Sequence, residues 1–242
     1  MDSQQWQQLA DNAGVDQPPT LPPHPGLSWA KELGLLRFEG DDAAGFLQGY
    51  LTSDTEQLEA GKLQPTALCN LKGRVVANGW ATLGSTDSVW LMVHRQLVDV
   101  TAEFLAKYLV FAKTNLERAN DSYTVLAGYE TPPDPTLNTL PLTGNLWLAV
   151  TTLTDAANRW QQSAAADLTS PDAFRYARIV AQLPLVNDHT TEQFLPQMLG
   201  LERIGAVDFN KGCYLGQEIV ARAQHRGAVK RSLVPLSWTV DS

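Results

Sequence analysis

Residues 211–218 read Lys-Gly-Cys-Tyr-Leu-Gly-Gln-Glu, so an ammonium, a thiol, a phenol and a carboxylate lie within one short segment. The residues that follow contain no helix breaker before Gly227, which predicts a helix from near Gly216 to Gly227. Cys213 would then lie just ahead of a helix N-terminus and close to Lys211. Because the helix dipole and a nearby ammonium both favour a thiolate, Cys213 is a candidate nucleophile, metal ligand or redox centre.

A structural role for the same residues is equally open. A single cysteine beside glycine and tyrosine is often only a small buried residue. Glu218, Arg222 and Arg226 follow at intervals of four and share one helix face, where Glu218 and Arg222 could form an ordinary surface ion pair. Residue chemistry alone does not decide between the two interpretations.

The stretch from Lys211 to Arg231 resembles the signature of the YgfZ family, folate-binding proteins related to the aminomethyltransferase of the glycine cleavage system. The family pattern is K-G-C-Y-x-G-Q-E, then an Arg, then R-G-x-x-K-R. Upstream, residues 46–54 (Phe-Leu-Gln-Gly-Tyr-Leu-Thr-Ser-Asp) resemble the family's F-L-Q-G-x-L-T-x-D, and residues 69–74 (Cys-Asn-Leu-Lys-Gly-Arg) resemble its C-x-x-K-G-R. The signature is matched at Lys211, Gly212, Cys213, Tyr214, Gly216, Gln217, Glu218, Arg222, Arg226, Gly227, Lys230 and Arg231.

The resemblance implies a tetrahydrofolate-binding accessory protein that supports iron-sulfur cluster assembly or repair and thereby tRNA modification. The implied cofactors are tetrahydrofolate or a derivative and a transient iron-sulfur cluster. The implied partners are folate, iron-sulfur assembly or radical tRNA-modifying proteins, and tRNA by direct contact. The alternative is an enzyme, a tetrahydrofolate-dependent one-carbon transferase or demethylase of the aminomethyltransferase superfamily. The residues expected to carry the activity are Cys213, Lys211, Tyr214, Gln217, Glu218 and Arg222.

Folate needs a surface on which its flat pterin can stack and cations for its glutamate tail. By the resemblance, Phe174 stands where family members place an aromatic residue in the folate pocket. Leu33 stands where a second aromatic residue can lie, but it is aliphatic. Arg178, Arg222 and Arg226 are candidate partners for the carboxylates. For Phe174, the alternative is a core residue of an amphipathic helix.

One departure from the related transferase bears on the chemistry. In that enzyme, a segment resembling N-x-x-G-G-x-x-D-D carries the carboxylate that assists methylene transfer to tetrahydrofolate. Counted from Asn70 and Gly73, the two aspartates fall on Ala77 and Asn78. Neither residue can serve as a carboxylate base, which argues against glycine-cleavage chemistry and favours a non-enzymatic factor centred on Cys213.

The net charge of −8 is unevenly distributed. Residues 201–231 hold six basic and three acidic residues, a net charge of +3, which leaves −11 for the rest of the chain. A basic patch on an acidic protein fits an anionic small molecule or a restricted RNA contact, with a solvated helix face as the alternative. A protein that coats nucleic acid broadly would have an overall basic balance.

Cysteine and apolar content predict a cytoplasmic protein that does not enter the membrane. Two cysteines are too few for a disulfide framework, no basic segment followed by an apolar one opens the chain, and no run approaches about 20 apolar residues. Cys69, Cys213 and four histidines show no zinc spacing, so no resident metal site is predicted. A transient cluster at Cys213 would need ligands from a second molecule.

Strand and helix patterns alternate without a regular βαβ rhythm, which favours an α+β fold with mostly antiparallel sheets. Strands are predicted at 33–40, 63–68, 75–82, 89–93, 123–127 and 146–150, and helices at 3–10, 41–47, 96–108, 155–163, 172–181 and 196–201.

The resemblance implies an aminomethyltransferase-like folate-binding fold, with ferredoxin-like α+β modules around a folate cleft and a C-terminal β-barrel that is largely missing here. The expected organisation is a flexible Gln/Pro-rich tail (1–26), a discontinuous folate-binding domain (27–118 and 170–230), a second α+β module (119–169) and a remnant of the barrel (231–242).

Overall fold

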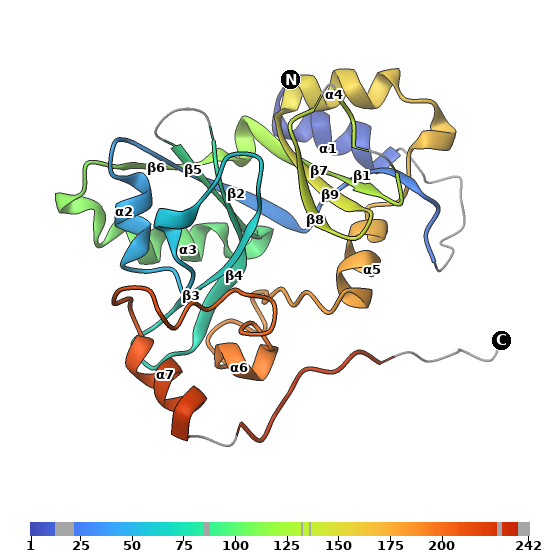
Figure 1. The fold of residues 1–242 in the computed structure, drawn as a ribbon. Coiled ribbons are helices and arrows are strands. Elements are labelled where there is room, and N and C mark those ends of the chain that lie inside the picture. Colours follow the sequence, from blue (N-terminus) through green and yellow to red (C-terminus); the bar gives the residue numbers. More distant parts are fainter. Residues whose placement is uncertain (13–21, 85–87, 132, 136, 227–228, 237–242) are drawn as a thin grey trace.

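The structure is a computed structural model, and it describes residues 1–12, 22–84, 88–131, 133–135, 137–226 and 229–236. Two antiparallel sheets form its centre (Figure 1). The five-stranded sheet has the order β3-β4-β5-β2-β6, and the four-stranded sheet has the order β1-β7-β9-β8. The strands are β1 (Gly26–Trp29), β2 (Leu33–Glu39), β3 (Gln64–Cys69), β4 (Val75–Leu83), β5 (Ser88–His94), β6 (Asn115–Arg118), β7 (Tyr123–Tyr129), β8 (Thr139–Thr143) and β9 (Leu146–Thr152).

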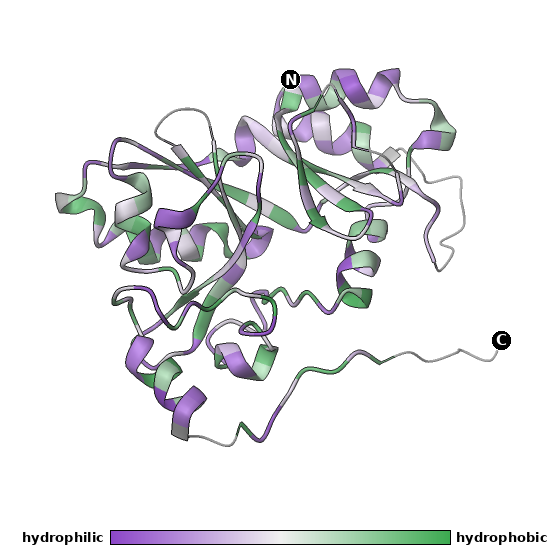
Figure 2. Cartoon of the chain, in the orientation of Figure 1, coloured by the Kyte–Doolittle hydropathy of each residue, from purple (hydrophilic) through white to green (hydrophobic). Residues whose placement is uncertain are grey.

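Helices cover the outer faces of both sheets, and the α+β class predicted from the sequence is confirmed (Figure 1). In Figure 2, hydrophobic and hydrophilic bands alternate along the helices, as expected where one helix face packs on the core. No closed barrel occurs among the described residues, where 231–236 form neither helix nor strand. The helices are α1 (Ser3–Asn12), α2 (Ala43–Gln48), α3 (Val98–Ala106), α4 (Leu153–Gln162), α5 (Asp172–Val180), α6 (Pro196–Leu199) and α7 (Gln217–Arg226).

The core has three layers, because successive side chains along each strand point to opposite faces of the sheet. In β5, Val89, Leu91 and Val93 pack into the cluster shared with α2 and α3, while Trp90 and Met92 point to the cluster between the two sheets. A third cluster lies between the four-stranded sheet and helices α1 and α4. Both faces of both sheets are therefore buried, which explains why these strands are apolar along nearly their whole length.

The N-terminal helix is part of the third cluster, although the sequence predicts a flexible tail over residues 1–26. Trp6 of α1 is 2% exposed and meets Trp29 and Trp160 edge-on, with ring centroids 5.8 and 5.6 Å apart. The helix predicted over 3–10 is present as α1, which packs on the core through Trp6. Residues 13–21 of the predicted tail lie outside the described residues.

Three further differences between the predicted and the observed elements have local causes. The predicted helix over 96–108 begins with a 3₁₀ turn at Arg95–Leu97, and α3 turns Val98, Ala102 and Leu105 inward, so Val100 is 44% exposed. Strands β1, β6 and β8 were not predicted, and all three are edge strands: β1 has four residues, β6 is mostly polar, and β8 contains Pro141. Strand β1 pairs with β7, so a segment assigned to the main domain completes the other sheet.

Candidate functional site

Three segments that resemble family motifs meet at one place in the structure. Residues 46–54 form the end of α2 and the turn after it, residues 69–74 connect β3 to β4, and residues 211–218 lead into α7. The Leu215 amide donates to the Gly49 carbonyl oxygen at 3.0 Å. The predicted C-terminal helix is confirmed, beginning at Gln217, whereas Gly227 lies outside the described residues.

Lys211 anchors the third segment to the first. Its ammonium donates to the carbonyl oxygens of Gln48 at 2.8 Å and of Leu51 and Ser53 at 2.7 Å. An ammonium has three N–H donors, so these three bonds use all of them. Burial lowers the pKa of Lys211 to about 8, although Asp54 opposes the shift, and the group remains charged at pH 7. Lys211 therefore holds the turn after α2 and has no donor left for Cys213.

Glycines allow the second and third segments to approach closely. Gly216 has a φ of +83°, and a Cβ atom there would overlap the Asn70 carbonyl oxygen. Gly73 has a φ of +67°, and a Cβ atom there would lie 2.9 Å from the Cβ of Ile219. The Asn70 side chain also shapes its own turn, because its oxygen accepts from the Lys72 amide at 2.9 Å. Glycine is thus required at both positions for backbone conformation and for space.

We expect Gly216→Ala to destabilise the chain more than Gly61→Ala. Gly61 has a φ of +77° and open space where a Cβ atom would lie, so alanine there costs only the left-handed conformation, about 1–2 kcal/mol. At Gly216 the overlap with Asn70 adds about 1–3 kcal/mol. Urea unfolding of both variants measures the difference, and equal losses would mean that the segments do not pack closely.

Glu218 and Arg222 form a surface ion pair at 2.7 Å, with their side chains 81% and 62% exposed. Such a pair contributes about 0.3–0.5 kcal/mol to stability. Gln217 is partly buried at the first position of α7. Arg226 ends the helix, and its side chain lies outside the described part of the structure. The structure thus places Gln217, Glu218 and Arg222 on the helix that follows Cys213, whereas Lys211 and Tyr214 lie before it.

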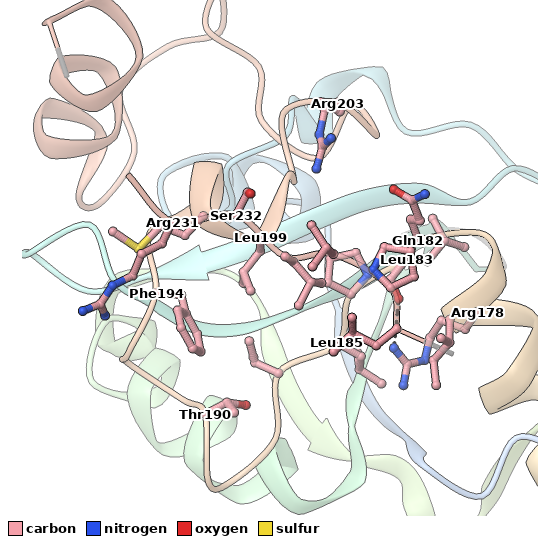
Figure 3. A pocket seen from close by; sticks show the side chains of 18 residues that line it. Arg178, Gln182, Leu183, Leu185, Thr190, Phe194, Leu199, Arg203, Arg231 and Ser232 are labelled. Atoms are coloured by element: carbon pink, nitrogen blue, oxygen red, sulfur yellow. Dashed lines mark hydrogen bonds between the residues drawn. The ribbon is translucent and has the colours of Figure 1, made fainter. Parts of the chain in front are cut away.

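A cavity of about 550 Å³ lies between the loop after α5, helix α6 and the C-terminal segment (Figure 3). Its walls are mostly apolar, with Phe194 as an aromatic residue. The sequence patterns pointed to neither Phe194 nor Arg203 of this cavity, although Arg203 belongs to the basic stretch over 201–231. The lining residues are Arg178, Ile179, Gln182, Leu183, Pro184, Leu185, Val186, Thr190, Phe194, Met198, Leu199, Arg203, Arg231, Ser232, Leu233, Val234, Pro235 and Leu236.

Of the residues predicted to bind folate, only Arg178 lines this cavity within the described ranges. Its guanidinium is already paired with Glu32 at 2.8 Å and donates to the Leu183 carbonyl oxygen at 2.9 Å. Phe174 and Leu33 are 0% and 1% exposed in the cluster between the sheets. Both are core residues in this structure, as the amphipathic-helix alternative for Phe174 expects.

The side chain of Asn78 holds the loop over 184–186, which forms part of the cavity wall. Its amide nitrogen donates to the Pro184 carbonyl oxygen at 2.7 Å, and its oxygen accepts from the Val186 amide at 2.8 Å. The residue is 3% exposed. The position at which the related transferase is expected to carry a carboxylate therefore holds an amide that pairs in both directions with the loop over 184–186.

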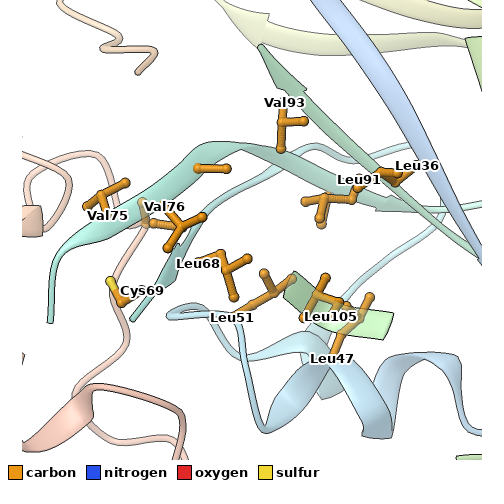
Figure 4. Packing of buried hydrophobic residues seen from close by; sticks show 14 of the residues in the cluster. Leu36, Leu47, Leu51, Leu68, Cys69, Val75, Val76, Leu91, Val93 and Leu105 are labelled. Atoms are coloured by element: carbon orange, nitrogen blue, oxygen red, sulfur yellow. The ribbon is translucent and has the colours of Figure 1, made fainter. Parts of the chain in front are cut away.

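The two cysteines differ in access. Cys69 is fully buried among Leu68, Val75 and Val76 (Figure 4), and burial raises the pKa of its thiol to about 12. Tyr214 lies close to Cys69, and its hydroxyl makes no hydrogen bond to the described residues. Burial, with a smaller effect of Cys69, raises the pKa of Tyr214 well above its usual value. Cys213 is exposed, so it is the accessible thiol.

Two kinds of feature are absent from the residues that the structure describes. In those ranges, no three His, Cys, Asp or Glu side chains are arranged to hold a metal ion. No described helix combines the length and apolarity needed to cross a bilayer.

Comparison with known proteins places these features in a family, although no family model matches the chain. The chain is 33% identical over 230 residues to the tRNA-modifying protein YgfZ of Klebsiella pneumoniae, covering 86% of this chain and 70% of that protein. It is 28% identical over 238 residues to the protein of the same name from Vibrio vulnificus, covering 90% and 72%.

A solved structure shows the same fold. The glycine cleavage system aminomethyltransferase T from Bartonella henselae superposes with a TM-score of 0.67 at 16% identity, covering 84% of this chain and 64% of that one. The chain therefore spans somewhat less than two thirds of the transferase and about 70% of the YgfZ protein of Klebsiella pneumoniae. The identity over most of its length, together with the three converging motif segments, shows that the chain belongs to the YgfZ family.

Proposed function

We propose that this chain is a folate-binding accessory protein of tRNA modification, which supports iron-sulfur enzymes and acts through Cys213. The observation that carries the proposal is the exposure of Cys213 beside the junction of three motif segments, in a chain whose other thiol is buried. Its relatives are named tRNA-modifying proteins.

The loop around Cys213 is suited to a reaction with another molecule. Lys211 and Tyr214, on either side of it, are 8% and 6% exposed and are anchored in the protein, while Gly212 and Cys213 face solvent. The described residues offer no cluster of metal ligands around the thiol. An iron-sulfur cluster handled by Cys213 would thus be bound jointly with ligands from a partner, as a cargo rather than a resident group.

The cavity supports the folate part of the proposal. Its volume of about 550 Å³ falls within the range of about 300–1,000 Å³ that is usual for small-molecule sites. Its apolar walls suit a flat heteroaromatic ring, and its arginines suit an anionic tail. Folate has both parts. Phe174 and Leu33, being buried, would contribute to this site only by supporting its walls.

The alternative, a one-carbon transferase, is less well supported. The buried amide of Asn78 uses its donor and its acceptor to hold the loop over 184–186. An amide cannot accept a proton as a carboxylate would, and Ala77, at the other aspartate position of the motif, supplies no carboxylate either. The accessory role therefore remains the better proposal.

We expect Cys213→Ser to abolish the function in cells. In a strain that lacks the native gene, wild-type chain should restore modified tRNA nucleosides, measured by mass spectrometry, and the serine variant should not. Cys69→Ala is the matched control, because it removes the other thiol from a site that solvent does not reach. Folate affinity should be unchanged by Cys213→Ser. Full restoration of the nucleosides by the serine variant would refute the assigned role of Cys213.

A further inference from the structure

We propose that Phe194 and Arg203 orient the ligand in the cavity, with the ring system of folate stacked on Phe194 and the carboxylates of its glutamate tail bound by Arg203. The inference rests on the proposed folate binding and deepens it. It assigns the stacking of the pterin ring to Phe194, because Phe174 is buried and does not line the cavity. It assigns the binding of the carboxylates to Arg203.

Charge singles out Arg203 among the three arginines of the cavity. The guanidinium of Arg178 is paired with Glu32 at 2.8 Å, with both side chains about nine-tenths buried, and Glu32 also contacts Arg175 at 3.4 Å. Neither Arg203 nor Arg231 forms an ion pair within the described ranges. In Figure 3 the guanidinium of Arg203 points toward the cavity lining, whereas that of Arg231 points away from it. Arg203 is thus the cation that an anionic ligand in this cavity would meet.

The backbone around Arg203 makes room for its side chain. Gly200 ends α6 in the left-handed conformation, with a φ of +71°. A Cβ atom at Gly200 would collide with the guanidinium of Arg203, so the arginine lies directly against the glycine. The guanidinium of Arg203, an exposed residue, therefore lies beside the turn that ends α6.

Backbone hydrogen bonds hold the loop that carries Phe194. The Phe194 carbonyl oxygen accepts from the Val75 amide at 2.9 Å, and the Glu192 amide donates to the Val75 carbonyl oxygen at 2.7 Å. The loop carrying Phe194 is thereby joined to the start of β4. The ring is half-buried and packs in part against the core, which leaves surface for a ligand. Among the described lining residues it is the one aromatic side chain.

Helix α6 joins the two residues into one unit. Phe194 lies two positions before Pro196–Leu199, and Arg203 lies four positions after it. The Gln197 side chain donates to the Val220 carbonyl oxygen of α7 at 2.9 Å, which fixes α6 in place. Because Phe194 and Arg203 line the same cavity, we expect a ligand with an aromatic body and a carboxylate at one end to contact both residues, whereas an uncharged ring would use only Phe194.

The test is an anaerobic calorimetric titration of the full chain with three probes: tetrahydropteroate, which lacks glutamate, tetrahydrofolate, and its triglutamate form. We expect Arg203→Gln to weaken the two glutamylated probes roughly tenfold to a hundredfold and to leave tetrahydropteroate unchanged. Phe194→Leu should weaken all three by about threefold to tenfold. Arg118→Gln, which breaks a surface pair with Asp99 instead, is the matched control and should bind like wild type.

The outcomes separate the two proposals. Equal affinity of Arg203→Gln and wild type for the glutamylated probes would overturn the carboxylate site while folate binding stood. Equal affinity of Phe194→Leu and wild type for all three probes would overturn the stacking role in the same way. No binding of any probe to the wild-type chain would overturn the folate proposal itself, and this inference with it.

Discussion

Lys211→Met should lower the free energy of unfolding by about 3–5 kcal/mol, the cost typical of removing one partner from a buried charged network. The substitution keeps much of the aliphatic stem but removes the ammonium that binds the carbonyl oxygens of Gln48, Leu51 and Ser53. Leu51 and Ser53 are 0% and 1% exposed, and Gln48 is partly buried, so solvent would replace the lost hydrogen bonds poorly. Urea unfolding at pH 7 measures the loss.

Lys62→Met is the matched control, since Lys62 pairs with Glu59 at the surface with its side chain 68% exposed. We expect that variant to lose less than about 1 kcal/mol. If Lys211→Met proved as stable as the control, the three hydrogen bonds would not hold the segment. A variant that stayed folded but lost only the Cys213-dependent activity would instead assign Lys211 a direct chemical role.

The contacts of Lys211 show what the motif alone does not reveal. The pattern around Lys211 predicts a cation close to Cys213, and the distance along the chain supports that view. In the folded chain, however, the ammonium points to carbonyl groups of a segment about 160 residues earlier. A motif fixes the residue types and not the direction of a side chain, because direction depends on which distant segment supplies the acceptors.

The fold was more predictable than the site. The strands around Val75 and Val89 follow from apolar runs that are buried on both faces, and the helix after Gly216 follows from its glycine boundary. The cavity was not predictable, since Phe194, Arg203 and Arg178 come together only through the turn at Gly200 and the loop held by Asn78. Arg178 carries the expected charge, but its ion pair with Glu32, which lies 146 residues earlier in the chain, has no local signature in the sequence.

The second large change in stability is expected for a substitution at Asn78. Asn78→Asp should destabilise the chain by about 2–4 kcal/mol at pH 7, because a carboxylate cannot donate to the Pro184 carbonyl oxygen that the amide now contacts at 2.7 Å. The charge would also be buried, since the position is 3% exposed and no cation contacts the Asn78 side chain in the described structure. Asn158→Asp, an exposed residue of α4, is the matched control for the added charge and should change stability by less than about 0.5 kcal/mol.

The sign of the pH dependence identifies the cause. Burial and the facing carbonyl oxygen would raise the pKa of Asp in the folded variant above its unfolded value of about 3.9, because the protonated acid can donate to Pro184 and still accept from Val186. Protonation then stabilises the folded state, so the difference from wild type should be smallest below about pH 4 and should grow as pH rises through the folded pKa. Urea unfolding at pH 4 and pH 7 tests this. A loss independent of pH would mean that the asparagine matters for its shape and not for its donor, and the buried amide would no longer explain why this position has no carboxylate.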